Sequence, residues 1–139
     1  MTKKEWLGQY RALLREERAV AASIEELRIL STSIKSPVSD GMPRGSSAGD
    51  GLASVVGKLD QMERRHEKML RTIARKREEI LDTINALQDS DERTVLTSHY
   101  INGLTWEQVA ECMGYTDRNI YFIHGRALQH IRIDCGNFS

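Results

Sequence analysis

The sequence predicts an all-α protein in which a long N-terminal helical hairpin of coiled-coil character precedes three short helices. Three observations support this fold class. Apolar residues recur every seven positions over two long stretches, both prolines fall between these stretches, and no segment alternates polar and apolar residues for long enough to form a strand. We therefore expect two long helices over residues 1–87, joined by a Gly/Pro/Ser linker at about 35–51, and a separate domain over 88–139.

The first heptad stripe precedes the linker and predicts one amphipathic helix of about 28 residues. Its members are Trp6, Tyr10, Leu13, Val20, Ile24, Leu27 and Ile34. The second stripe follows the linker and comprises Leu52, Val56, Leu59, His66, Leu70, Ile73, Ile80, Ile84 and Leu87. Stripes of this length have to be covered, so the two helices pack against each other, against a second copy of the chain, or both.

Two polar residues interrupt these stripes, Glu17 in the first and His66 in the second. An antiparallel pairing that brings residue 31 near residue 52 places Glu17 opposite His66. A Glu–His layer inside the seam would satisfy both groups and fix the register of the helices. Alternatively, each side chain lies at the edge of the seam in water, because the long linker leaves the register uncertain by a turn.

The C-terminal domain begins with a short helix that Asp89-Ser90-Asp91 caps and Asn102-Gly103 stops. Thr105 and Gln108 have the spacing of a capping box, which opens a second helix that ends at Gly114. Thr116 or Asp117 caps the third helix. Its predicted buried face is Ile120, Ile123, Ala127 and Ile131.

The second and third of these helices meet the steric requirements of a helix-turn-helix. Ala110 is the small residue where the helices cross, Gly114 permits positive φ in the turn, and Ile120 is the apolar residue that packs the second helix onto the first. An ordinary helical corner has the same spacing, so the pattern alone leaves both interpretations open.

The same window resembles region four of bacterial sigma factors, which binds the −35 promoter element. The resemblance lies in Leu104–Glu111, Met113–Thr116, Asn119–Tyr121 and Arg126–Leu128. With its helical N-terminal half and the Gly-Met-Pro-Arg-Gly-Ser motif at 41–46, nearly the whole chain is similar to phage and prophage transcriptional regulators of Gram-positive bacteria, the RinA- and ArpU-type late-gene activators. This resemblance implies a sequence-specific DNA-binding regulator of phage genes that acts with host RNA polymerase.

The candidate DNA-binding residues lie at the starts of the two motif helices and on the outward side of the last one. They are Thr105, Trp106, Thr116, Asp117, Arg118, Asn119, Tyr121, Phe122 and Arg126. Arg118 suits a bidentate contact with guanine and Asn119 one with adenine. The hydroxyl and indole groups of residues 105 and 106 suit phosphate contacts. We interpret His124 and His130 as surface or phosphate-proximal groups.

Two features modify this prediction. In the sigma resemblance the base-contacting positions fall on 117, 118 and 121, and Asp117 and Tyr121 replace arginine, so we do not expect recognition of an ordinary −35 element. Residues 88–139 contain four arginines and seven acidic groups, a net charge of −3, whereas Lys58–Arg77 hold eight basic and three acidic residues. A protein-interaction module that binds polymerase or another host protein without DNA is therefore the alternative, with Tyr121 and Phe122 as its docking patch.

The remaining expectations concern partners, chemistry and location. We expect double-stranded DNA, host RNA polymerase and a second copy of the chain as partners. The sequence has no phosphate-loop, HExxH or Gly-x-Ser-x-Gly motif, so we expect neither an enzyme nor a cofactor. Cys112 and Cys135 lack metal-ligand spacing and predict free thiols without a metal site. The absence of a long apolar run predicts no membrane insertion and a cytoplasmic location in the bacterial host.

Overall fold

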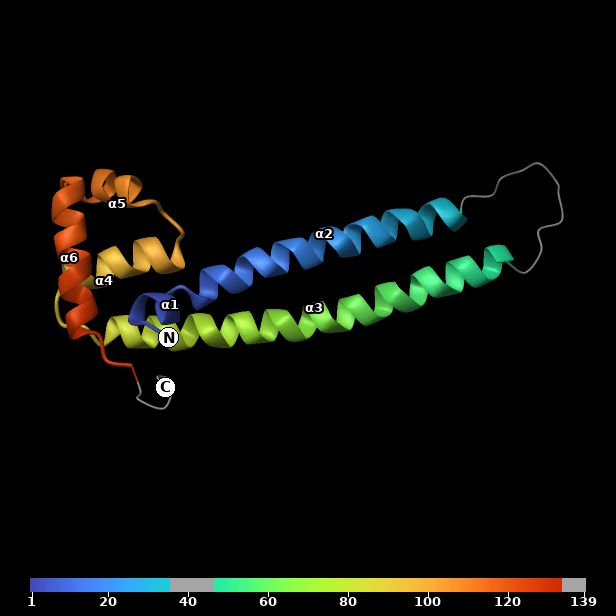
Figure 1. Ribbon diagram of the computed structural model, residues 1–139, viewed down its shortest axis with the longest axis horizontal. Coiled ribbons are helices and arrows are strands. Elements are labelled where there is room, and N and C mark those ends of the chain that lie inside the picture. The colour runs from blue at the N-terminus through green and yellow to red at the C-terminus, as the bar shows by residue number, and fades with distance from the viewer. Residues whose placement is uncertain (36–46, 134–139) are drawn as a thin grey trace. The chain divides into compact units, whose positions relative to one another are not determined.

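The computed structural model describes residues 1–35 and 47–133 (Figure 1). The helices are α1 (Lys3–Leu7), α2 (Gln9–Lys35), α3 (Ser47–Asn85), α4 (Ser90–Leu96), the π-helical segment η1 (Thr97–Ile101), α5 (Trp106–Met113) and α6 (Asp117–His130). The described residues contain no strand, which confirms the predicted all-α class. Across these same ranges, no helix has the length and apolar character needed to cross a membrane.

Several predicted features lie outside the described residues. These are most of the linker, the side chain of Ile34 and Cys135. The part of the linker predicted over 47–51 is helical, because α3 begins at Ser47. No proline follows Pro43, and a glycine within a helix costs only about 1 kcal/mol, so α3 tolerates Gly49 and Gly51.

The chain forms two compact units. One contains Met1–Leu14 and Ile73–Ser139, described as far as residue 133, and the other contains Arg15–Thr72. The last turns of α3 therefore belong to the unit that contains α4, α5 and α6. The boundary between residues 87 and 88, which the sequence suggests for two functional domains, stays a prediction.

The core of the first unit joins α1, the end of α3, α4, η1 and the end of α6. Its buried members are Trp6, Leu7, Ile80, Ile84, Leu87, Leu96, Tyr100, Ile101, Ala127 and Ile131. A second cluster connects α4, α5 and α6 and consists of Val95, Val109, Ala110, Ile120 and Ile123. Trp106 packs against both clusters and joins them. The heptad stripe of α3 thus ends in a core shared with the C-terminal helices.

Local signals define the three C-terminal helices as the sequence predicts. The Asp89 carboxylate accepts the backbone N–H groups of Asp91 and Glu92 at the start of α4. Thr105 and Gln108 form the reciprocal capping box of α5. Gly114 closes that helix with a φ of 71°, and the Thr116 hydroxyl caps α6. The predicted inner face of α6 is buried from Ile120 to Ile131.

Within the second unit α2 and α3 run antiparallel (Figure 1). Glu17 Oε1 lies 2.9 Å from His66 Nε2, and both side chains are mostly buried. Arg28 Nη2 lies 3.1 Å from Glu63 Oε1. Glu17 and His66 are therefore paired between the two helices, as in the first of the two alternatives that the sequence offers. Val56 and Leu70, predicted to lie in the buried stripe, are instead 43% and 45% exposed, because two helices share only one seam.

Gly114 in the α5–α6 turn and Gly125 inside α6 give opposite predictions for alanine substitution. At Gly114 a Cβ meets no atom within 4 Å, so the cost of Gly114→Ala is the left-handed backbone alone. We expect the free energy of unfolding to fall by about 1 kcal/mol. Gly125 lies inside α6 with equally open surroundings. There alanine should raise stability by up to about 1 kcal/mol. Urea unfolding of both variants measures the two changes in the free energy of unfolding. Equal changes would contradict the left-handed conformation assigned to Gly114.

Candidate functional site

The candidate site is the outward side of α6, and its orientation follows from the inward side. Ile120 is fully buried and Ile123 is 3% exposed, packed with Val95 of α4 and Val109 of α5. Because a helix turns by about 100° per residue, burying these positions directs the intervening ones to solvent. Tyr121 and Phe122 are accordingly 54% and 65% exposed.

The first turn of α6 carries three exposed polar residues, Asp117, Arg118 and Asn119. The Asn119 backbone N–H donates to the Thr116 hydroxyl at 3.1 Å. Within the described part of the chain, the three side chains form no hydrogen bond or ion pair with other residues. The donors of Arg118 and Asn119 are therefore free to bind an external acceptor, at the end of a helix where backbone N–H groups also point outward.

The threonines that cap α5 and α6, Thr105 and Thr116, are both exposed. Thr105 accepts the Gln108 N–H at 3.2 Å, as Thr116 accepts that of Asn119. A hydroxyl that accepts a hydrogen bond still has its own proton to donate. Both caps can thus stabilise their helix and donate to a phosphate oxygen as well.

Trp106 is placed differently from the prediction of a phosphate contact. It is half-buried, and its ring stacks on His99 with 3.7 Å between the centroids and 14° between the planes. Its centroid also lies 4.5 Å from that of His124 and 5.9 Å from that of Tyr121. Trp106 therefore supports the base of the exposed surface and packs behind Tyr121.

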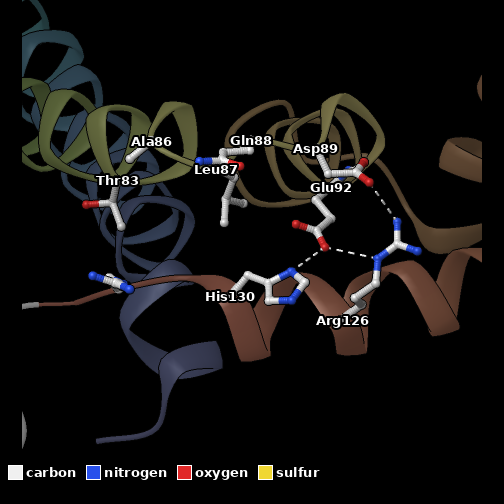
Figure 2. A pocket seen from close by; sticks show the side chains of 9 residues that line it. Thr83, Ala86, Leu87, Gln88, Asp89, Glu92, Arg126 and His130 are labelled. Carbon is white, nitrogen blue, oxygen red and sulfur yellow. Dashed lines mark hydrogen bonds and ion pairs between the residues drawn. The ribbon is translucent and has the colours of Figure 1, made fainter.

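Arg126 is held in an ion-pair network, and its guanidinium carbon also lies 5.8 Å from the centre of the Phe122 ring. Its Nε donates to Glu92 Oε1 at 3.0 Å and its Nη2 to Asp89 Oδ2 at 3.1 Å, as Figure 2 shows. His130 Nδ1 lies 2.7 Å from the same Glu92 oxygen. The Glu92 side chain is only 2% exposed, so this network joins α4 to α6 through a buried carboxylate whose charge would be uncompensated without these partners.

The sequence interpretation missed this network, although a signal existed. Arg126 and His130 are four residues apart and so share one face of α6.

A cavity of about 750 Å³ lies beside these two residues, at the end of α3 (Figure 2). Its lining comprises Thr83, Ala86, Leu87, Gln88, Asp89, Glu92, Arg126, His130 and Arg132. Both acidic groups of the lining are paired with Arg126. Over residues 1–35 and 47–133, no cluster of His, Cys, Asp or Glu has an arrangement that could hold a metal ion.

His124 corrects the expectation of a surface histidine. It is 6% exposed, and its Nε2 forms a hydrogen bond of 2.8 Å with the Tyr100 hydroxyl. Burial, helped by the nearby charges of Lys4 and His99, lowers the pKa of His124 to about 4. Burial also raises the pKa of Tyr100 to about 12. The pair is therefore neutral near pH 7 and forms part of the structural base of α6.

Residues 37–132 match the model of a family described as "Protein of unknown function (DUF1492)". This match spans more than half of the chain. The chain belongs to this family. The region matched to DUF1492 includes α3, α4, α5 and α6, and thus the whole outward side of α6. Comparisons with curated proteins and with solved structures gave no match.

The buried histidine predicts acid sensitivity of this DUF1492 protein. The unfolded chain protonates His124 near its ordinary pKa of 6.5, whereas the folded chain does so only near 4. Stability is therefore fully present above pH 6.5 and is lost as the pH falls toward 4. We expect a loss of about 2–3 kcal/mol, to which His99 adds because burial lowers its pKa too. Urea unfolding from pH 7 to pH 4 measures it. His124→Gln should flatten this dependence, and an unchanged slope would refute the assignment.

The buried carboxylate gives a prediction for Glu92→Gln. Loss of its charge leaves Arg126 and His130 with a neutral partner at a buried position, so we expect a loss of roughly 2 kcal/mol in the free energy of unfolding. The matched control is Glu111→Gln on α5, which is exposed and should change stability by less than about 0.5 kcal/mol. Thermal or urea unfolding compares the two variants, and equal effects would remove the structural role from Glu92.

Proposed function

We propose that this protein is a sequence-specific DNA-binding transcriptional regulator of phage genes that acts with host RNA polymerase through a sigma-like helix-turn-helix formed by α5 and α6. The observation that carries the proposal is the exposed first turn of α6. Arg118 and Asn119 have no partner there within the described residues, while the opposite side of the helix is buried. The phage setting and the polymerase rest on the resemblance to late-gene activators and to sigma region four.

The geometry suits entry of α6 into the major groove. In helix-turn-helix proteins the N-terminal residues of the second helix contact base edges. Arg118 offers the paired donors that match guanine, and Asn119 offers the donor and acceptor that match adenine. Tyr121 follows one turn later and offers its ring to a thymine methyl group. These three residues form the proposed base-contacting set.

The backbone contacts of the proposed complex come from the helix starts. The hydroxyls of Thr105 and Thr116 and the first N–H groups of α5 and α6 are the donors for phosphate oxygens. Arg126 is omitted from the proposed set because Glu92 and Asp89 already hold its guanidinium. Trp106 contributes by supporting Tyr121 from behind.

The charge of the C-terminal region sets the expected strength of binding. Four arginines and seven acidic groups over residues 88–139 give little general attraction to phosphate. A single copy should therefore bind DNA weakly. Two copies on a palindromic site, or simultaneous contact with RNA polymerase, would raise the effective affinity without new DNA contacts.

One specific observation favours a second candidate function. Tyr121 and Phe122 expose large aromatic surfaces side by side in sequence. Aromatic residues are enriched at the centres of protein–protein interfaces. The alternative is therefore a protein-interaction module that docks on RNA polymerase or another host protein through this pair and does not contact bases.

Selection of bound duplexes from a random-sequence pool, followed by titration of the selected duplex, tests the proposal. We expect a selected sequence whose affinity falls about 5- to 150-fold in Arg118→Ala and in Asn119→Ala, the range for losing one bidentate base contact. The matched control is Arg15→Ala on α2, which removes the same charge from an exposed position outside α6. It should leave the preference among bases unchanged.

The two candidate functions give different results in this experiment. If no sequence is enriched at any salt concentration while purified RNA polymerase is still bound, the DNA-binding proposal is wrong and the interaction module is supported. If Phe122→Ala then loses polymerase binding while the other variants keep it, the docking patch lies at Phe122.

A further inference from the structure

The N-terminal residues 1–14 belong to the same compact unit as α4, α5 and α6. Trp6 is 2% exposed and Leu7 is fully buried, both in the core that this unit shares with the end of α6. Lys3 Nζ donates to two backbone carbonyl oxygens in the last turn of α6, at 2.8 and 3.1 Å. These contacts fix the start of α2 against the C-terminal helices.

Arg11, in the first turn of α2, lies on the loop that leads into α5. Gly103 of this loop has a φ of 75°, and a Cβ placed on it would be 2.5 Å from the Arg11 guanidinium carbon and from Nη2. The guanidinium therefore lies against Gly103, two residues before Thr105, which caps α5. Glycine suits this position because of both the left-handed backbone and the close approach of the side chain.

The Arg11 guanidinium has donors to spare. Among residues 1–35 and 47–133 it has no hydrogen-bond or ion-pair partner. The side chain is only partly exposed, and a guanidinium carries five N–H donors. A cation held in this way against the backbone suits an anionic acceptor from another molecule.

This guanidinium lies next to the surface that we assign to DNA. The ring centroids of Trp106 and Tyr121 are 5.9 Å apart, so the start of α5 adjoins the exposed side of α6. The Thr105 hydroxyl and the first N–H groups of α5 are the proposed donors to phosphate. The first turn of α5 has no basic residue of its own, and it contains the acidic Glu107. Arg11 supplies the positive charge that this helix start lacks.

We propose that Arg11 contacts a DNA phosphate beside the start of α5, so that the N-terminal segment takes part in DNA binding. This inference rests on the proposed DNA-binding function and extends its interface to a segment distant in the sequence. The charges favour a phosphate as the acceptor. Residues 1–14 hold three basic residues and one acidic residue, whereas residues 88–139 are acidic. Arg93 and Arg126 of the latter region already donate to acceptors of the chain itself.

Fluorescence anisotropy of the full chain with the selected duplex and with an unrelated duplex, over a series of salt concentrations, tests the proposal. In Arg11→Ala we expect both affinities to fall by the same factor of about ten, because a phosphate contact carries no sequence information. The slope of log K against log salt concentration should decrease by about one. The matched control is Arg28→Ala, which removes the same charge from an exposed position of α2 about five turns away and should leave the slope unchanged.

Urea unfolding shows whether Arg11→Ala keeps its stability. If it does not, Arg11→Gln decides by the same criteria, because it removes the charge and keeps most of the side chain. A folded Arg11 variant with wild-type affinity and slope would overturn this inference and leave the DNA-binding proposal intact. So would a loss confined to RNA polymerase binding, or an equal loss of DNA binding in Arg28→Ala. A wild-type chain that binds no duplex at any salt concentration would refute the proposed function itself, and this inference with it.

Discussion

The structure of the candidate site depends on the burial of one side of α6. Ile120 and Ile123 are enclosed by side chains from α4 and α5, and this fixes the rotation of the helix about its own axis. The left-handed conformation of Gly114 sets the direction in which the chain enters the helix. Once both constraints are met, helical geometry alone determines that Arg118 and Tyr121 face solvent. No separate interaction is needed to present the surface that we assign to DNA.

The polar network strengthens this arrangement at the other end of α6. Glu92 holds Arg126 and His130, and the neutral Tyr100–His124 pair fills the space behind the helix. The polar contacts therefore anchor the C-terminal half of α6, while the outward side of its N-terminal half stays exposed. This division explains why basic and aromatic residues of the same helix have different roles: Arg126 serves the packing of the protein, whereas the proposed contacts belong to its first turns.

The sequence was sufficient wherever a local signal determines the structure. The caps at Thr105 and Thr116 and the inner face of α6 follow from neighbours within one or two turns. It was insufficient where the partner is distant in the chain. Arg126 is engaged by an acidic group 34 residues away, and His124 is buried against η1. The exposure of Leu70 could not be predicted either, because a heptad pattern indicates the apolar side of a helix but not which of its residues one partner helix covers.

The central claim is that the exposed N-terminal turns of α6 contact a DNA duplex. The most direct measurement is the change in backbone amide chemical shifts when a duplex selected by the protein is added to the isotope-labelled chain. The account predicts that the largest changes occur between Thr116 and Phe122, with a second group at the start of α5. Changes confined to α2 and α3, or none in α6 at saturating duplex, would contradict it.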